Sequence, residues 1–227
     1  MIKIFIVLFI MGIFVFIFTW IGELNAPKKA KKIGDAYESL VAKKIKAHLG
    51  IVPVRNVIIS TDDDQTEVDM VLVNTKGVFA IECKHRGDSD ILTGSYDDQV
   101  YTILPDEPIK NPFRQNYKHQ LFLQDLLSID STYNIVFVNC SFNLKYNGEE
   151  HRSYQNAILN LLARERCAMV SEDGNEKGII AFADAINSLP DIYTAEEVDN
   201  MINILSAHIA TDEEREAHAE YIKNKYS

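Results

Sequence analysis

Carboxylates and one lysine alternate on both sides of a turn predicted at residues 74–77. If the flanking strands pair symmetrically about this turn, Asp69 faces Glu82 and Glu67 faces Lys84. Two opposed carboxylates destabilise a sheet. A divalent cation between them removes the repulsion, and Mg²⁺ is commonly held by one or two carboxylates. The pattern therefore favours a metal site. The alternative is a solvated face with a weak Glu67–Lys84 ion pair.

A third carboxylate lies among the apolar positions of a helix predicted over residues 35–49. The apolar stripe of this helix consists of Tyr37, Leu40, Val41, Ile45 and Leu49. Glu38 falls inside the stripe, where a carboxylate needs a partner. Either Glu38 joins the acids of the hairpin, or its side chain reaches solvent or accepts a local hydrogen bond.

A second helix is predicted over residues 112–128, because Asn111 suits an N-cap and a proline follows it at the first helical position. Gln115 and His119 are one turn apart and share a face of this helix. Gln115 can orient a water or a phosphate oxygen, and His119 can serve as a general base or a hydrogen-bond donor. The alternative is an amphipathic surface that carries an ordinary histidine.

Other chemistry-bearing residues form no further motif. His85 and Arg86 follow the second strand of the hairpin, either within reach of a phosphate or as ordinary loop residues. Cys83, Cys140 and Cys167 are too few and too scattered for a disulfide framework or a CxxC metal site. The sequence contains no GxxxxGK, GxSxG or HExxH motif. The candidate chemistry therefore rests on the acids and the lysine.

The elements that must position these residues form an α/β pattern around a mixed sheet. Strands are predicted over residues 52–60, 66–73, 78–84, 99–104 and 133–140, with an edge strand over 166–170 and a helix over 180–189. Residues 86–98 are predicted to form a loop, and residues 151–164 an irregular or helical insertion. Thr194 and Thr211 each begin a capping-box sequence, which predicts two helices at the C-terminal end.

The charge distribution limits how the protein can bind nucleic acid. Of the 227 residues, 47% are hydrophobic and 25% are charged, which excludes wholesale disorder. Residues 1–33 contain five lysines and one glutamate, a net charge of +4, whereas residues 34–227 contain 18 basic and 32 acidic side chains, a net charge of −14. A broad electrostatic grip on phosphates is excluded. Nucleic-acid chemistry would need a local site with metal ions.

The N-terminal region predicts a membrane anchor. Residues 4–22 form an uncharged apolar run of the length that crosses a bilayer as a helix. Lysines at 28, 29, 31 and 32 follow it, which places the C-terminal side in the cytoplasm. Residues 23–33 then form a short basic tether. The alternative is a cleaved signal peptide, which fits less well because the basic cluster follows the apolar run.

The chain resembles the nuclease-related domain, NERD, in four segments that occur in order: GDAYE at 34–38, TEVD at 66–69, GVFAIECK at 77–84 and NPFRQNYKH at 111–119. NERD is similar to the PD-(D/E)xK nuclease superfamily, and the resemblance covers roughly residues 34–145. Val68 stands where that superfamily often has proline before the metal-binding aspartate. The sequence is therefore closer to NERD than to the wider superfamily.

The resemblance implies an α/β fold with a restriction-endonuclease-like αβββαβ core around a central mixed sheet. The expected organisation is a transmembrane helix within residues 1–22, the tether at 23–33, the nuclease-related domain at 34–145 and a variable extension at 146–227 that ends in helices. An N-terminal membrane helix ahead of such a domain is also similar to many members of the family.

The resemblance also implies roles for single residues. Asp69 and Glu82 match the metal ligands, and Glu38 matches the acidic residue of the first helix that joins them. Lys84 matches the lysine that stabilises charge or positions the attacking water, and Gln115 matches the glutamine of the later helix. Their expected cofactor is Mg²⁺, with Mn²⁺ as a possible substitute.

Two functions of different kinds follow. The first is a membrane-anchored, Mg²⁺-dependent nuclease that hydrolyses DNA, with His85, Arg86 and His119 as substrate contacts. The second is a catalytically inactive nuclease-fold module that binds a protein or nucleic-acid partner at the membrane. The expected partners are DNA, the lipid bilayer through residues 4–22 and a protein partner through the C-terminal helices. The expected location is the cell membrane, with a single span and a cytoplasmic domain.

Overall fold

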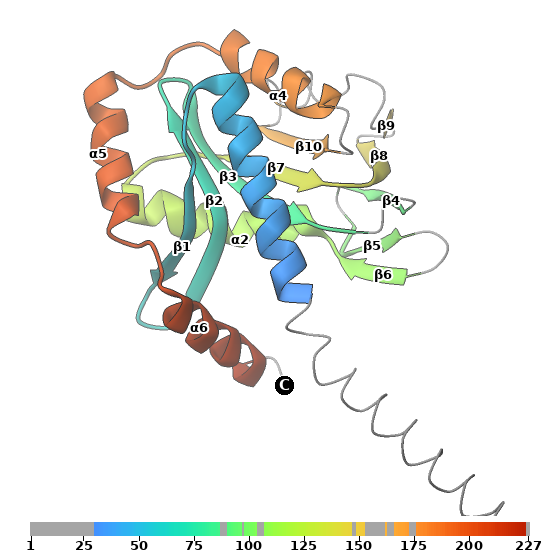
Figure 1. The fold of residues 1–227 in the computed structure, drawn as a ribbon, viewed down its shortest axis with the longest axis horizontal. Coiled ribbons are helices and arrows are strands. Elements are labelled where there is room, and N and C mark those ends of the chain that lie inside the picture. Colours follow the sequence, from blue (N-terminus) through green and yellow to red (C-terminus); the bar gives the residue numbers. More distant parts are fainter. Residues whose placement is uncertain are drawn as a thin grey trace, which may run out of the picture. The chain divides into compact units, whose positions relative to one another are not determined.

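A computed structural model describes residues 30–86, 90–96, 98–103, 107–146, 149–152, 162, 166–172 and 176–225 (Figure 1). The chain divides into two units, residues 1–37 and residues 38–227. In the first unit, residues 30–37 are described and are helical. The second unit opens with helical residues 38–49 and contains all the labelled strands and helices.

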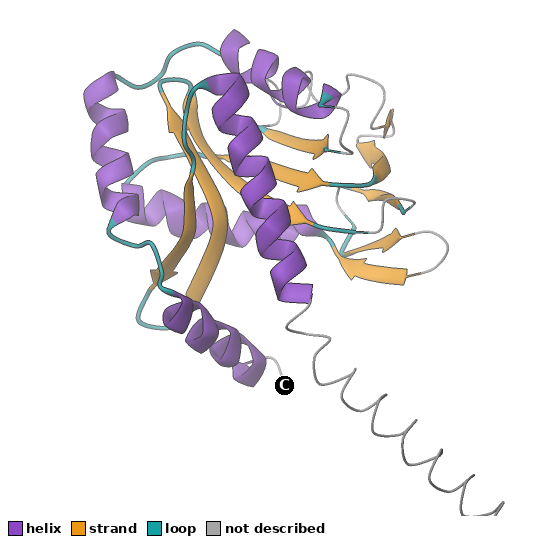
Figure 2. Cartoon of the chain, in the orientation of Figure 1, coloured by secondary structure: helices purple, strands orange, loops and turns teal. Residues whose placement is uncertain are grey.

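The second unit contains both strands and helices (Figure 2). The strands are β1 Val54–Ser60, β2 Gln65–Asn74, β3 Gly77–Lys84, β4 Ile91–Ser95, β5 Val100–Ile103, β6 Glu107–Lys110, β7 Tyr133–Val138, β8 Ser141–Tyr146, β9 Glu149–Arg152 and β10 Cys167–Ser171. The helices are α2 Pro112–Leu127, α4 Lys177–Ser188, α5 Ala195–Ser206 and α6 Asp212–Lys225.

The first sheet has the strand order β1-β2-β3-β7-β10. Its first three strands pair antiparallel, whereas β7 pairs parallel with both β3 and β10. The sheet is therefore mixed, and β10 lies at its edge, which confirms both predictions. A helix, three strands, α2 and β7 follow one another in the predicted order, with β4, β5 and β6 inserted between β3 and α2.

The hairpin of β2 and β3 has the predicted register. Its pairs run from Asn74↔Gly77 to Met70↔Ile81. Beyond Ile81, β3 continues its pairing with β7 as far as Lys84↔Val138, while β2 continues its pairing with β1. Asp69 and Glu82 therefore lie where the pairing between β2 and β3 ends. Where the two strands separate, side-chain and backbone groups are no longer used in β2–β3 pairing and can form a site.

Helices α2 and α5 cover one face of β1, β2 and β3. Val71, Val73 and Ala80 on this face pack with Leu123 of α2 and Leu205 of α5. The sequence places these apolar residues on the same face as Asp69 and Glu82, so the charged face of the hairpin is not an open, solvated surface. Helical residues 38–49 lie in front of the sheet in Figure 1, and α2 lies behind it.

A second sheet, with the order β6-β5-β4-β8-β9, was not predicted. The predicted loop over residues 86–98 is wrong, because β4 occupies part of it. Residues 151–152, which were predicted to begin an irregular or helical insertion, instead end strand β9. Strand β4 has few apolar residues, and Gly94 interrupts it. A Cβ atom at Gly94 would lie 2.5 Å from the Tyr101 ring, so the glycine gives this ring room.

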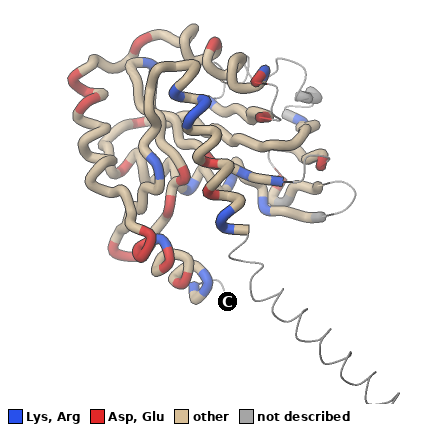
Figure 3. The backbone as a smooth tube through the Cα atoms, viewed as in Figure 1, with Lys and Arg blue, Asp and Glu red and all other residues tan. Residues whose placement is uncertain are grey.

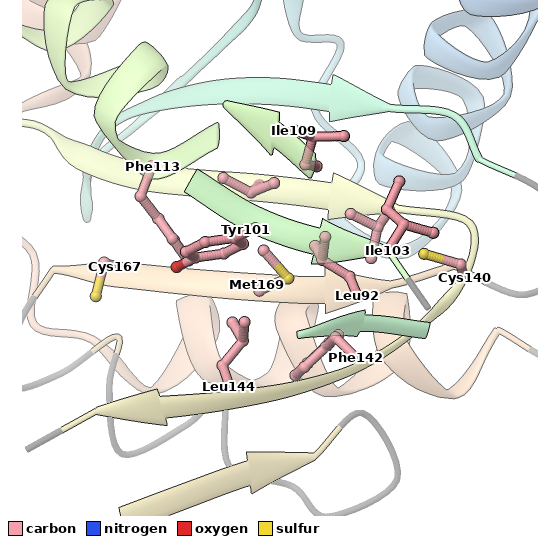
Figure 4. Close-up of a cluster of buried hydrophobic side chains, with 12 residues drawn as sticks. Leu92, Tyr101, Ile103, Ile109, Phe113, Cys140, Phe142, Leu144, Cys167 and Met169 are labelled. Atoms are coloured by element: carbon pink, nitrogen blue, oxygen red, sulfur yellow. The ribbon is translucent and has the colours of Figure 1, made fainter. Parts of the chain in front are cut away.

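The second sheet packs its inner face onto β7 and β10. Leu92, Tyr101 and Phe142 of the second sheet join Val136 of β7 and Met169 of β10 in one buried cluster (Figure 4). The cluster lies on the same face of the first sheet as α2, since Val136 and Glu82 are register partners. The C-terminal end of β3 is therefore flanked by α2 and by the second sheet.

The predicted helix ends agree with the structure. Asn111 caps α2, because its Oδ1 accepts hydrogen bonds from the backbone N–H groups of Phe113 and Arg114, and Ser128 ends the helix in the left-handed conformation. Thr194 and Glu197 form the capping box of α5. Thr211 and Glu214 make the same reciprocal contacts at α6.

The predicted apolar stripe of the first helix is correct only in part. Val41 and Ile45 are fully buried, but Leu40 is 43% exposed. In the part of the chain that the structure describes, no helix is both long and apolar enough to span a bilayer. The predicted membrane segment, residues 4–22, lies outside the described residues.

Candidate functional site

Glu82 is the centre of a buried polar network on β3. Its side chain contacts Lys84 Nζ at 2.5 Å and accepts a hydrogen bond from Gln115 Nε2 at 2.8 Å, both through Oε1. Its Oε2 lies 3.2 Å from Nε2 of His119. Burial disfavours the carboxylate, but Lys84 and His119 together lower its pKa to about 2. Glu82 is therefore ionised at neutral pH.

Lys84 is the cation of this network. Burial opposes its charge, but the carboxylate of Glu82 outweighs burial and raises the pKa of the ammonium above its ordinary value. Asp69 raises the same pKa further. The structure therefore holds a charged lysine beside the two strand carboxylates.

Asp69 has the opposite electrostatic situation. Its Oδ2 accepts a hydrogen bond from the backbone N–H of Cys83 at 2.8 Å. Burial raises the pKa of Asp69 well above the ordinary value of 3.8, and the charges of Glu82 and Glu38 raise it further. The backbone donor and Lys84 only partly offset these effects. Burial and the two neighbouring carboxylates therefore outweigh the donor and the lysine that favour the charged form of Asp69.

Glu38 is buried, as its place in the apolar stripe predicts, and is 8% exposed. The partner that such a carboxylate needs is Arg55 of β1, whose Nη2 lies 3.4 Å from Glu38 Oε2. The same guanidinium donates to Ser39 Oγ at 3.1 Å through Nη1. Glu38 therefore acts on Asp69 through its charge while it is paired with an arginine that the sequence reasoning did not identify.

The predicted three-carboxylate ligand set is not assembled. Among the described residues, which include Glu38, Asp69 and Glu82, no group of three or more His, Cys, Asp or Glu side chains could hold one metal ion. Glu38 is turned to Arg55, and both oxygens of Glu82 already have partners. What the structure does bring together is an acid pair at the end of the β2–β3 pairing, with a lysine beside it.

Glu67 does not pair with Lys84, which corrects the cross-strand prediction. Its carboxylate forms an ion pair with Nε of Arg215 on α6. The physical reason is that the pairing of β2 with β3 ends at Met70↔Ile81, so Glu67 and Lys84 are not cross-strand neighbours. Lys84 is consequently free to turn to Glu82.

His119 lies inside the site rather than on a substrate-facing surface. It is 6% exposed, and its second ring nitrogen, Nδ1, lies 2.7 Å from Oγ1 of Thr66. Two buried asparagines fix the helix that carries it. Asn116 Nδ2 donates to the backbone oxygen of Ala80 at 2.9 Å, and Asn134 Nδ2 donates to the backbone oxygen of Phe113 at 2.9 Å.

His85 and Arg86 continue the chain beyond Lys84. His85 is exposed. Arg86 is held through its backbone, since its N–H donates to Asn139 Oδ1 and its carbonyl oxygen accepts from Asn139 Nδ2. The guanidinium Nε of Arg86 is buried and has no hydrogen-bond partner. A donor of this kind is unusual and suits an anionic ligand.

Sequence reasoning missed the residues that position the site from neighbouring elements. Thr66 lies inside the TEVD segment, two residues before Val68. Because side chains two apart in a strand share a face, this spacing was the available signal that Thr66 lies on the same face as an apolar residue. Asn134 interrupts an otherwise apolar strand, which marks a buried polar group that needs partners. Arg55 could have been sought once Glu38 required a cation.

The fold and the site define an α/β protein with mixed sheets and C-terminal helices that gathers acids and a lysine where two strands separate. Residues 33–142 match the family model described as the nuclease-related domain, NERD. The resemblance predicted from the four segments is therefore confirmed for this part of the chain, and it indicates a nuclease-related function. No curated protein and no solved structure matches the chain.

Proposed function

We propose that the protein is a membrane-anchored, Mg²⁺-dependent nuclease that hydrolyses DNA phosphodiester bonds on a restriction-endonuclease-like core. The observation that carries the proposal is the convergence of Asp69, Glu82 and Lys84 at the end of the β2–β3 pairing. Perturbed ionisable groups that share a site are candidates for catalytic roles. The match of residues 33–142 to the nuclease-related domain supports the same class of chemistry.

The donor set suits a divalent cation. Asp69 is a buried carboxyl whose pKa is raised by burial and by two neighbouring carboxylates, which is the situation that a bound cation relieves. Asp69 and Glu82 would hold Mg²⁺, or Mn²⁺ in its place, and water and substrate phosphate would complete the ligands. Glu38 would add negative charge from its buried position. When bound, the ion supplies a water of lowered pKa and neutralises phosphate charge.

The protein's own groups have separate tasks in this proposal. Lys84 carries the positive charge that stabilises negative charge developing on the phosphate oxygens. Gln115, which reaches the site from an exposed position on α2, orients a water or a phosphate oxygen. Arg86 contacts a neighbouring phosphate through its unpartnered Nε, and His85 lies beside it at the surface.

The acidic surface limits affinity for DNA. Acidic side chains gather along α5 and α6, including Glu196 and Glu197 in the first turn of α5 and Asp212, Glu213 and Glu214 in the first turn of α6 (Figure 3). These charges repel phosphates. DNA would therefore approach from the side of Arg86, and the acidic helices would face a protein partner.

The anchor is part of the proposal and rests on the sequence of residues 4–22. We expect the full-length protein to remain in the membrane fraction after alkaline carbonate extraction, with the nuclease-related domain on the cytoplasmic side. A variant that lacks residues 4–22 should appear in the supernatant. Release of the intact protein by carbonate would contradict the anchor.

A catalytically inactive module that binds a partner at the membrane is the second candidate. The observation that favours it is the contact between Lys84 and Glu82, because Lys84, Gln115 and His119 already take both oxygens of Glu82. An ion must displace some of these contacts before it can bind there.

Cleavage of DNA distinguishes the two candidates. The full-length protein, purified in detergent, is incubated with plasmid and linear DNA in Mg²⁺, in Mn²⁺ or in EDTA, beside Asp69→Ala and Lys84→Ala. The nuclease proposal predicts cleavage that needs the metal and both side chains. A wild type that is as inert as its variants, although both are folded, would contradict it and favour the binding module.

A further inference from the structure

Glu82 is held by a chain of two buried side chains that the proposed function leaves without a role. Nε2 of His119 lies 3.2 Å from Glu82 Oε2, and Nδ1 lies 2.7 Å from Oγ1 of Thr66. Thr66 is 3% exposed, His119 is 6% exposed and Glu82 is 2% exposed. Because none of the three can turn to water, the orientation of each depends on its neighbour.

We infer that Thr66 is a positioning residue for the metal ligand Glu82 and acts through His119. This inference rests on the proposed function, in which Glu82 holds the cation. The hydroxyl of Thr66 contacts Nδ1, and Nε2 on the other side of the ring contacts Glu82 Oε2, so the hydroxyl fixes the ring orientation that presents Nε2 to the carboxylate.

The other contacts of Glu82 explain why its orientation matters. Lys84 and Gln115 both bind Oε1, so His119 alone holds Oε2 among the side-chain contacts described for this carboxylate. Without the hydroxyl of Thr66, Nδ1 is buried and unpaired, and the ring loses the contact that fixes its orientation toward Glu82. Partners that orient a metal ligand in this way commonly change metal affinity about 10- to 100-fold when they are lost.

The fold places Thr66 independently of any substrate. Thr66 is the register partner of Ile59 on β1. The flanking residues of β2 bind α6 instead, since Gln65 Oε1 lies 2.8 Å from His218 Nδ1 and Glu67 is paired with Arg215. The start of β2 is thus held by β1 and α6, and the hydroxyl of Thr66 is presented to α2.

The test compares Thr66→Val, which keeps the shape and removes the hydroxyl, with Thr66→Ser, which restores it. Thr132→Val is the matched control, because Thr132 is also 3% exposed and its Oγ1 accepts a hydrogen bond from Gln124 at 3.3 Å. Full-length proteins in detergent are titrated with Mn²⁺, and DNA cleavage is measured against Mg²⁺ and against DNA concentration.

We expect Thr66→Val to weaken Mn²⁺ binding and to raise the half-saturating Mg²⁺ concentration about 10-fold or more. The KM for DNA should stay within about twofold of the wild-type value, Thr66→Ser should restore metal affinity, and Thr132→Val should behave as the wild type. Unchanged metal dependence in Thr66→Val, or a loss that serine does not restore, would overturn the inference.

A second readout separates failure of the inference from failure of the proposed function. The ring nitrogens of His119 are observed by ¹⁵N NMR in the metal-free protein. In Thr66→Val, the resonance of Nε2, the nitrogen that faces Glu82, should move away from its wild-type position, and Thr66→Ser should restore it. If the wild type neither binds Mn²⁺ nor cleaves DNA, the proposed function fails. In that case an unchanged Nε2 resonance in Thr66→Val overturns the role of Thr66 in orienting His119 toward Glu82, and a shift that serine reverses supports it.

Discussion

Two buried glutamate–lysine pairs in this molecule have different surroundings. Glu82 contacts Lys84 at 2.5 Å, and the charges of Glu82 and Glu38 both act on Asp69. Glu172 follows β10 and forms an ion pair with Lys44, and its backbone N–H donates to the carbonyl oxygen of Val138. Burial of a glutamate with a lysine is therefore not by itself the mark of a site.

The difference lies in the balance of charge. At Glu172, one lysine matches one fully buried carboxylate, and the further acid near Lys44 is Glu176, whose side chain is 49% exposed. At Asp69, burial and the charges of Glu82 and Glu38 outweigh the groups that favour ionisation, which raises the pKa of Asp69. The arrangement at Glu172 connects a helix to the end of β10, whereas at Asp69 a buried carboxyl lies where its neighbours disfavour its charge, which a bound cation would relieve.

The largest expected effect distinguishes the two lysines by activity. Lys84→Met should lower metal-dependent DNA cleavage by about 10²- to 10³-fold, because it removes the positive charge beside the reacting phosphate. Lys44→Met, assayed at a temperature at which it is folded, should cleave DNA at the wild-type rate. Equal losses in the two variants would show that both lysines serve the fold alone.

Lys44→Met should lower the stability of the protein more than Lys84→Met does, which is the reverse of their order in activity. Lys44→Met leaves Glu172 as a buried charge without its cation, and its free energy of unfolding should fall by about 3–5 kcal/mol. The measurement is urea unfolding followed by circular dichroism. Lys44→Met combined with Glu172→Leu should recover most of the loss, because an apolar pair avoids the cost of burying charge. A double variant as unstable as the single one would refute the charge argument.

The two strand acids should affect stability with opposite signs. The pKa of Asp69 is raised above 3.8, so its ionised form destabilises the folded protein once the pH exceeds that value. Asp69→Asn should therefore raise the midpoint of thermal unfolding at pH 7 in EDTA, by on the order of 2–4 °C. The gain should vanish below pH 3.8, where the carboxyl is protonated in both states.

Glu82→Gln is the matched comparison. The pKa of Glu82 is lowered from 4.5 to about 2, so its ionised form stabilises the folded protein above pH 4.5, and this stability is lost as the pH falls towards 2. The substitution should lower the midpoint at pH 7. Shifts of the same sign in Asp69→Asn and Glu82→Gln would contradict the described charge balance.

The smallest effect is expected at a solvent-exposed pair. Lys118 Nζ lies 3.0 Å from Asp64 Oδ2, with about a third of both side chains exposed. Lys118→Met should change the free energy of unfolding by less than about 1 kcal/mol, and less at high salt, because solvent screens the pair. A loss of unfolding free energy comparable with that of Lys44→Met would show that burial does not determine how much these ion pairs contribute to stability.

Local signals accounted for much of the fold. The turn at residues 74–77 set the hairpin register, and Asn111, Thr194 and Thr211 marked helix starts through side chains that bind backbone N–H groups within one turn. These features depend on neighbours in the sequence, which is why the sequence alone predicted them. The positions of the carboxylates on β2 and β3 were predicted for the same reason, because they follow from the register of the hairpin.

The remaining features depend on contacts between distant segments. Strand β4 has one fully buried apolar residue, Leu92, so its polarity predicted a loop. The pairs Glu67–Arg215 and Glu172–Lys44 join residues 148 and 128 positions apart, and no periodicity connects them. The partner of each acid determines whether it is a ligand or a structural residue, and that choice is made by the tertiary fold.

Calorimetric titration of the metal-free, full-length protein with Mn²⁺ tests the central claim most directly. The account predicts saturable binding by the wild type, loss of that binding in Asp69→Asn, and unchanged binding in Glu172→Gln. Absence of binding by the folded wild type, or equal binding by Asp69→Asn, would contradict the claim that the acids around Asp69 form a metal site.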